Sequence, residues 1–246
     1  MGPVSPLHQR PLLLLSNRRW NSTLADRLSR QLNRPIESIN EPAKLTLEAV
    51  AAIDPQWIFV PHWSYLIPES IWGSWPTVIF HMTDLPYGRG GSPLQNLIQR
   101  GHSSTMLSAL RCDSALDAGE IFIKQPLSLY GSAEEIFLRA DGVIEQMIEK
   151  IVCDEIVATP QQGEPVQFSR RTPGQSNLAS CPDGDLGSWY DQIRMLDAEG
   201  YPHAFLEAHG MRLEFRRVSQ RSDGLHADVR IVPMSPDQSV NQDIPS

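Results

Sequence analysis

Cysteine is scarce in this sequence, which holds three cysteines among 246 residues. Cys112, Cys153 and Cys181 lie far apart and form no Cys-x-x-Cys pair. This spacing argues against a disulfide framework and against a cysteine-based zinc site, and the spacing of His, Asp and Cys indicates no other metal site. The cysteine usage favours a reducing compartment, so we expect a cytoplasmic protein.

The sequence also lacks a convincing membrane or export segment. The apolar run PLLLL at 11–15 is too short to span a bilayer, and the residues before it do not have the form of a signal peptide. We therefore interpret this run as a buried strand and expect no membrane partner.

Positively charged residues are fewer than negatively charged ones: the sequence has 21 Lys and Arg and 29 Asp and Glu, which gives a net charge of −8. Proteins that bind nucleic acids usually present a basic surface, so we expect no nucleic-acid partner, although a local basic patch stays open. The hydrophobic fraction of 41% and the charged fraction of 20% are typical of a globular protein. The length suffices for one large domain, or for one domain with a small one attached.

Strand-like and helix-like segments alternate between residues 11 and 151. Short apolar runs predict strands, and apolar residues spaced three or four apart predict helices. The expected strands are 11–16, 35–40, 57–61, 77–81 and 120–129, and the expected helices are 21–32, 42–53, 92–101 and 132–152. Such alternation predicts an α/β fold with a Rossmann-like, mostly parallel sheet and helices on both faces.

The C-terminal third has a different pattern, with short alternating strands expected at 166–173, 211–218 and 226–232 around a helix at 188–197. We therefore expect a first unit at 11–151, a small β-rich subdomain at 152–234, and flexible tails at 1–10 and 235–246. The subdomain has little room for a core of its own. We expect it to be buried against a second copy in a homodimer.

His81 ends the expected strand 77–81, at the carboxyl edge where open parallel sheets bind ligands. Asp117 precedes the expected strand 120–129 and is predicted to lie at the same edge. A carboxylate beside a histidine holds its tautomer, and such a pair can move a proton while an amine attacks a carbonyl. The alternative is that His81 only bonds its own loop and that Asp117 belongs to an ordinary turn.

Three glycines, Gly88, Gly90 and Gly91, follow His81 within ten residues. Glycine permits positive φ and lets a ligand approach backbone amides closely. The segment GRGG matches neither a dinucleotide fingerprint nor a phosphate loop, so these glycines alone do not define a ligand.

Several motifs resemble the folate-dependent formyltransferases. They are FHMTDLPYGRGGSPLQNLIQRG (80–101), Thr105 and LDAGEIFIKQPLSLYGSAEEIFLRA (116–140), with PHWSYLIPESIW (61–72), SRRTP (169–173) and WYDQIRMLDAEGYPHAF (189–205) as further similar segments. The family includes methionyl-tRNA formyltransferase, glycinamide ribonucleotide formyltransferase and the sugar N-formyltransferases. His81 matches the family's histidine, and Asp117 with Gly119 matches its Asp-x-Gly.

The resemblance implies 10-formyltetrahydrofolate as the formyl donor, without a metal. It implies that His81 relays a proton and that Asp117 orients His81. The family's asparagine falls at Ile79, which cannot donate a hydrogen bond. We expect Asn96 to replace it as a catalytic donor, with Thr83 or a backbone amide of 88–91 as alternatives. The residues expected to bind the folate are Leu66, Ile67, Met82, Asp84, Leu85, Gly88, Gly90, Gly91, Asp113 and Gly119.

Within the family, the length and the segment 169–205 resemble a sugar nucleotide N-formyltransferase most. The segment FHMTDLPYGRGGSPLQN (80–96) is most similar to the enzymes that act on 4-amino-4,6-dideoxy sugars in the pseudaminic acid route. We therefore expect an amino-sugar nucleotide as partner, such as a UDP-linked 4-amino-4,6-dideoxy sugar. Arginines that can meet phosphates and a tyrosine are the expected substrate-binding residues: Arg89, Arg170, Arg171 and Tyr201, with Arg194 as a further arginine. The alternatives are a methionyl-tRNA-type formyltransferase, a non-catalytic protein that binds folate or a nucleotide sugar, and a hydrolase that releases formate.

Overall fold

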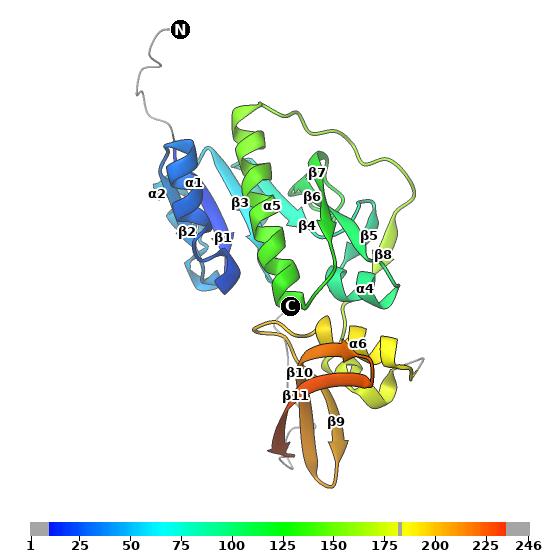
Figure 1. Cartoon of the computed structure of the whole chain (residues 1–246). Helices are drawn as coiled ribbons and strands as arrows, with labels where there is room; N and C mark the ends of the chain where they lie inside the picture. Colours follow the sequence, from blue (N-terminus) through cyan, green and yellow to red (C-terminus); the bar gives the residue numbers. More distant parts are fainter. Residues whose placement is uncertain (1–9, 182–183, 235–246) are drawn as a thin grey trace.

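The computed structural model describes residues 10–181 and 184–234, so the expected tails lie outside the described residues except for Arg10 (Figure 1). The strands are β1 Leu12–Ser16, β2 Ile36–Ile39, β3 Trp57–His62, β4 Thr77–His81, β5 Tyr87–Gly90, β6 Ser104–Arg111, β7 Ile121–Ser128, β8 Val166–Phe168, β9 Ala204–Ala208, β10 Met211–Arg221 and β11 Gly224–Pro233. The α-helices are α1 Leu24–Leu32, α2 Leu47–Ile53, α3 Glu69–Trp72, α4 Pro93–Gln99, α5 Ala133–Cys153 and α6 Leu186–Arg194. Of these helices, none combines the length and the apolarity that crossing a bilayer requires.

The central sheet has the strand order β2-β1-β3-β4-β6-β7. The first four strands are parallel, whereas β6 pairs antiparallel with both β4 and β7. This arrangement confirms the expected α/β fold with a mostly parallel sheet. The strand β6 was not expected from the sequence, although it lies beside the strand that ends at His81.

Helices cover both faces of the sheet, and the strand β1 is accordingly apolar on both of its sides. In β1, Leu12 and Leu14 belong to the large core that includes α1 and α5, and Leu13 and Leu15 belong to a second core that includes α2 and α3. All four leucines are buried. A strand that is buried on both sides is typical of parallel sheets, in which crossover helices lie on the two faces.

The long helix α5 covers one face of the sheet. It begins with a capping box, in which Ser132 and Glu135 each accept a hydrogen bond from the other's backbone N–H. Its expected apolar stripe is confirmed, since Ile136, Ala140, Ile144, Ile148 and Ile151 are all buried.

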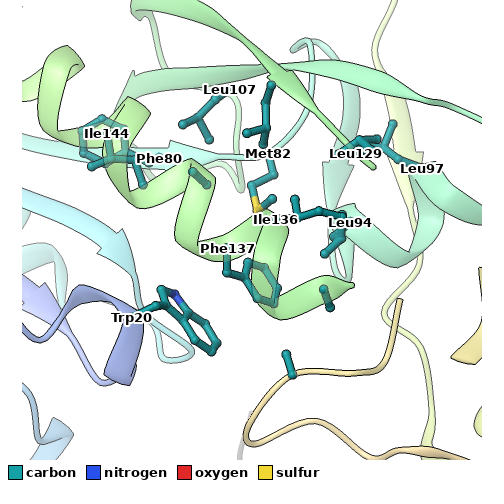
Figure 2. Packing of buried hydrophobic residues seen from close by; sticks show 14 of the residues in the cluster. Trp20, Phe80, Met82, Leu94, Leu97, Leu107, Leu129, Ile136, Phe137 and Ile144 are labelled. Carbon is teal, nitrogen blue, oxygen red and sulfur yellow. The ribbon is translucent and has the colours of Figure 1, made fainter. Parts of the chain in front are cut away.

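Figure 2 shows how α5 packs on β4 and on the segment after β1. Phe80 and Met82 of the β4 strand and its end lie near Ile136 and Ile144, and Phe137 lies beside Trp20. The rings of Trp20 and Phe137 stack with centroids 4.6 Å apart. The residues that end β4 are therefore held by a close-packed core.

The C-terminal region forms an antiparallel sheet, β9-β10-β11, with α6 packed on it (Figure 1). The expected strand at 166–173 does not join this sheet, because β8 pairs parallel with β5, which contains Gly88 and Gly90 of the glycine loop 88–91. The backbone of Phe168 thereby supports the loop that follows His81. The boundary at 152, the tails and the homodimer stay predictions.

Candidate active site

A cavity of about 390 Å³ lies at the carboxyl ends of β3 and β4. Its wall includes the loop after β1, the end of the glycine loop 88–91, one side of α5, and the segments 170–173 and 200–202. Of the residues expected in the site, eight line this cavity: His81, Met82, Gly90, Gly91, Asp117, Arg170, Arg171 and Tyr201. The structure therefore brings together the predicted proton relay and most of the predicted substrate-binding residues.

His81 and Asp117 face each other in the cavity wall, and both are buried. His81 Nε2 lies 2.8 Å from the carbonyl oxygen of Gly88, which can only accept a hydrogen bond, so Nε2 carries a proton. His81 Nδ1 lies 3.6 Å from Oδ1 of Asp117. That separation is longer than a hydrogen bond, so Nδ1 is not committed to Asp117, although the carboxylate lies close enough to act on the charge of the ring.

The segment that carries Asp117 begins at the N-terminal end of β4, which is the end opposite to His81. Because β6 is antiparallel to β4, the connection 112–120 starts where the Cys112 N–H bonds to the Thr77 carbonyl. The connection then folds back, so that Asp117 lies beside His81 and its Oδ2 accepts the Gly90 N–H at 2.9 Å. The shared carboxyl edge of parallel strands, from which the proximity was expected, is therefore not its cause.

Gln161 holds this connection in place. Its Nε2 donates to the carbonyl oxygens of Asp117 and Gly119, each at 2.9 Å. Arg89 in turn donates to Oε1 of Gln161 at 2.7 Å. Arg89, which the sequence suggested as a substrate-binding residue, thus supports the residue that orients Asp117. Gln161 itself was not singled out in the sequence, because nothing in its neighbourhood marks it.

A substitution at Gly119 tests how tightly the connection 112–120 is packed. A Cβ at Gly119 would lie 2.0 Å from the carbonyl oxygen of Arg111, which is backbone and cannot move aside. We expect Gly119→Ala to destabilise the protein by about 2 kcal/mol or more, because overpacking forces the backbone to shift. The measurement is the free energy of unfolding in urea.

The matched control for this prediction is Gly142→Ala. Gly142 lies within α5, and a Cβ there meets no atom within 4 Å. The same substitution is expected to stabilise the protein by up to about 1 kcal/mol, because alanine is the better helix former. Equal unfolding energies for the two variants would show that Gly119 is not constrained by Arg111.

Asn96 is not available as a catalytic donor, contrary to expectation. Its Nδ2 donates to the carbonyl oxygens of Gly91, Ser92 and Ser169 at 3.0–3.1 Å. Its Oδ1 accepts from Arg100 at 2.8 Å. The amide is therefore fully used in joining α4 to the glycine loop and to the segment after β8. Asn96 is a structural residue, which the sequence could not show.

Several residues expected to bind folate lie outside the cavity wall. Leu66 is 82% exposed, Ile67 packs on the second core, and Leu85 is 1% exposed, so its side chain cannot reach a ligand. Asp84 pairs with Lys124 at 2.5 Å, and Asp113 accepts bonds from Ser114 in its own turn. Gly88 bonds to His81 through its carbonyl oxygen. The folate contacts assigned to these positions, apart from the side chain of Leu85, stay predictions.

Four aromatic side chains form a wall in the same cavity lining, and of these only Tyr201 was expected from the sequence. It consists of Trp20, His62, Phe137 and Tyr201. Phe137 stacks between Trp20 and Tyr201, with centroid distances of 4.6 and 5.4 Å, and His62 meets Trp20 and Phe137 edge-on. His62 ends β3 as His81 ends β4, which is the signal that could have found it.

His62 is expected to make the protein sensitive to acid. Burial, with the charge of Arg18 as second cause, lowers the pKa of His62 from 6.5 to about 3. Below pH 6.5 the unfolded chain takes up a proton that folded His62 refuses, so stability is lost as pH falls. Relative to His62→Phe, the wild type should lose about 2 kcal/mol more unfolding free energy between pH 7 and pH 4.5.

The control for this measurement is His226→Phe, which replaces an exposed histidine on β11. This variant should lose as much stability as the wild type between the two pH values. If His62→Phe lost as much unfolding free energy as the wild type between pH 7 and pH 4.5, the folded protein would accommodate the protonated form of His62.

Within residues 10–181 and 184–234, no three His, Cys, Asp or Glu side chains are grouped so that they could hold a metal ion.

The fold and the site define a Rossmann-like α/β protein with a buried histidine–carboxylate pair in the wall of a cavity at the carboxyl ends of β3 and β4. Residues 173–232 match the family model described as the methionyl-tRNA formyltransferase C-terminal domain. The solved structure of a methionyl-tRNA formyltransferase from Clostridium thermocellum is 44% identical, with a TM-score of 0.87 over 91% of this chain and 99% of that one. The chain therefore belongs to the formyltransferase family.

Two further relatives extend the comparison. The methionyl-tRNA formyltransferase of Wolinella succinogenes is 25% identical over 70% of this chain and 56% of its own length. HypX from Aquifex aeolicus, solved in complex with tetrahydrofolic acid, shares the fold at a TM-score of 0.71, with 17% identity over 91% of this chain and 46% of that one. The chain spans about half the length of the curated relatives it matches.

The comparisons correct the expected partner. We expected an amino-sugar nucleotide and no nucleic acid. The similar proteins from Clostridium thermocellum, Wolinella succinogenes and Rickettsia bellii are all methionyl-tRNA formyltransferases by name, and that name specifies a tRNA substrate. The net negative charge was a poor guide, because charge summed over a whole chain does not describe the surface around one cavity.

Proposed function

We propose that this protein transfers a formyl group from 10-formyltetrahydrofolate to the amino group of an aminoacyl-tRNA, with methionyl-tRNA as the first acceptor to test. The observation that carries the proposal is the buried pair of His81 and Asp117 in the wall of a cavity large enough for two reacting groups. A histidine held by a carboxylate is suited to moving a proton during acyl transfer.

The cavity fits a folate donor on the side of His81. Ile79, Met82 and Leu116 present apolar surface there, and Leu116 is 63% exposed. A flat aromatic ring that covered Leu116 would remove this surface from water. When bound, the donor supplies an activated formyl group on nitrogen.

His81 moves the proton in the proposed reaction. As the acceptor nitrogen bonds to the formyl carbon, it must lose one proton, and the folate nitrogen gains one when its bond to that carbon breaks. His81 Nδ1 is the ring nitrogen available for this exchange, because Nε2 is committed to the Gly88 carbonyl. Asp117 stabilises the imidazolium that forms, and no proton is gained or lost overall.

The arginines of the cavity support a polyanionic acceptor. Arg18, Arg170 and Arg171 line it, and within the described part of the chain no carboxylate forms an ion pair with any of them. Burial lowers the pKa of Arg171. Positive side chains that lack an internal counter-charge attract phosphates.

The experiment is a formyl-transfer assay with a labelled donor and purified tRNAs that carry different amino acids. We expect N-formylated methionyl-tRNA, with tetrahydrofolate released in equal amount. Release of labelled formate without a formylated acceptor would indicate a hydrolase. Binding of the donor with no turnover on any amine would indicate a non-catalytic binding protein. Both outcomes contradict the proposal.

A further inference from the structure

A buried carboxylate interrupts the apolar face of α5. Asp141 is 4% exposed and lies between Phe137, one turn before it, and Ile144, one turn after it. It takes no part in the proton relay, and it does not line the cavity, although its neighbours Ala140 and Ile144 do. Burial raises the pKa of the Asp141 carboxyl, so an ionised group at this position is unfavourable unless other groups compensate for the loss of water.

Asn21 and Arg27 supply this compensation. One carboxylate oxygen of Asp141 accepts a hydrogen bond from Nδ2 of Asn21, and the other accepts one from Nη2 of Arg27. Arg27 also donates to Glu145, one turn further along α5, at 2.7 Å. A buried charge is stable in a fold when it is paired and hydrogen-bonded, and removing one partner of such a pair is costly. Asp141 therefore joins α5 to two segments, the loop after β1 and the helix α1.

The bond to Asn21 continues into the loop 17–22, part of which lines the cavity. Oδ1 of Asn21 accepts a hydrogen bond from Oγ of Ser16 at 2.7 Å, and the same oxygen of Ser16 accepts the backbone N–H of Arg18 at 3.3 Å. A continuous chain of hydrogen bonds thus runs from Asp141 to the backbone of Arg18. The side chain of that arginine lines the cavity, so the chain ends at the cavity wall.

Two further contacts join α5 to this loop, and neither fixes it as firmly. Trp20 stacks on Phe137, one turn before Asp141, with ring centroids 4.6 Å apart. A stack of two flat rings permits several offsets. Arg19 pairs with Glu134, but the side chain of Arg19 is 58% exposed, and exposed ion pairs contribute little. The buried, directional bond to Asp141 is therefore the contact that sets the position of the loop along the helix.

We infer that Asp141 is a positioning residue, which through Asn21 fixes the loop 17–22 for binding of the acceptor. The inference rests on the proposed function, in which the arginine side of the cavity takes the acceptor and the side of His81 takes the donor. It adds a residue that acts on acceptor affinity without touching the acceptor. A loop that is held in place before binding loses little freedom on binding, so releasing it weakens the acceptor complex and leaves the proton relay unchanged.

The test is steady-state formyl transfer by Asp141→Leu, which removes both hydrogen bonds and fills the core with an apolar side chain of similar size. We expect KM for the acceptor to rise by roughly tenfold or more, while kcat and KM for the donor stay within about twofold of the wild type. Asp141→Asn still offers an oxygen to Asn21 and should raise KM for the acceptor by about threefold at most. A purely structural role would lower kcat through a smaller folded fraction and leave KM unchanged.

The matched control is Glu145→Leu. Glu145 lies on the same helix and also pairs with Arg27, at 2.7 Å, but among the described residues it has no hydrogen bond to the loop 17–22. Its removal leaves Asn21 bonded to Asp141. Both kcat and KM for the acceptor should therefore stay within about twofold of the wild type. A rise in this KM equal to that of Asp141→Leu would assign the effect to Arg27 and contradict the inference.

Hydrogen exchange of the free protein tests the loop itself. The amides of 17–22 should exchange roughly tenfold faster in Asp141→Leu than in the wild type, and those of β4 should not change. Circular dichroism and the Tm check the fold. If Asp141→Leu does not fold, Asn21→Ala takes its place, because it removes the same link and keeps the pair of Asp141 with Arg27.

Wild-type exchange at 17–22 in the folded variant would overturn the inference, as would faster exchange with an unchanged KM for the acceptor. Absence of formyl transfer by the wild type would contradict the proposed function. The exchange rates, which need no substrate, would then still decide whether Asp141 fixes the loop.

Discussion

Replacing His81 by alanine is expected to lower kcat for formyl transfer by a factor of 10² to 10⁴, the range for loss of a general acid–base group. His81 is the residue with a ring nitrogen in the cavity wall beside Asp117, and its Nε2 proton is committed to Gly88. Without the imidazole, the attacking amine has no held base to take its proton. Steady-state kinetics with saturating donor is the measurement.

Imidazole added to the His81→Ala protein should restore part of the lost activity, because the substitution leaves a space beside Asp117. A purely structural role for His81 would not produce such rescue. His226→Ala, an exposed histidine on β11 paired with Asp223, should keep wild-type kinetics. Wild-type kcat in a folded His81→Ala protein would remove the proposed proton relay.

Replacing Asp117 by asparagine is expected to lower kcat by about a hundredfold or more while KM for both substrates changes little. The carboxylate faces Nδ1 of His81 at 3.6 Å and accepts the Gly90 N–H at 2.9 Å. Asparagine can still accept the Gly90 bond, but it offers no negative charge to the imidazolium. The comparison of kcat with KM is the readout.

The fold should survive this substitution. Asp117 has φ +52°, a left-handed conformation that asparagine tolerates, and the bond from Gln161 Nε2 is accepted by the backbone carbonyl of Asp117, which the substitution keeps. Glu120→Gln is the matched control, because Glu120 is a carboxylate on the same connection whose side chain is 43% exposed and pairs with Arg111. It should retain full activity. A loss of Tm in Asp117→Asn equal to its loss of activity would indicate that Asp117 is mainly structural.

If the protein formylated another amine and not that of an aminoacyl-tRNA, the proposed acceptor would be wrong. The predictions for His81→Ala and Asp117→Asn would still hold. Both concern the proton relay, which any amine acceptor would need.

Ile79 and His81 are two residues apart in β4, and the alternation of a strand places two such residues on the same face. Both residues line the cavity, so the pattern was sufficient there. Asn96 shows the limit of the same reasoning. Its position on a helix near the glycine loop suggested a catalytic donor, yet its amide bonds to three carbonyl oxygens from two segments 70 or more residues apart in the chain.

The sequence by itself determined the alternation of strands and helices, because each element carries its own apolar period, and it determined that His81 ends a buried strand. It also contained the motif that pairs this histidine with Asp117. Local periodicity depends on neighbours within a few residues, so it can be read without the fold.

Only the tertiary structure decided how the pair is assembled and what faces it. The antiparallel β6 sends the 112–120 connection to the far end of β4, and Gln161, Arg89 and the Gly90 N–H then hold Asp117 beside His81. The aromatic wall joins Trp20, His62, Phe137 and Tyr201 from four separate segments. Contacts between residues so distant in sequence have no local pattern, because they depend on strand order, register and the packing of α5.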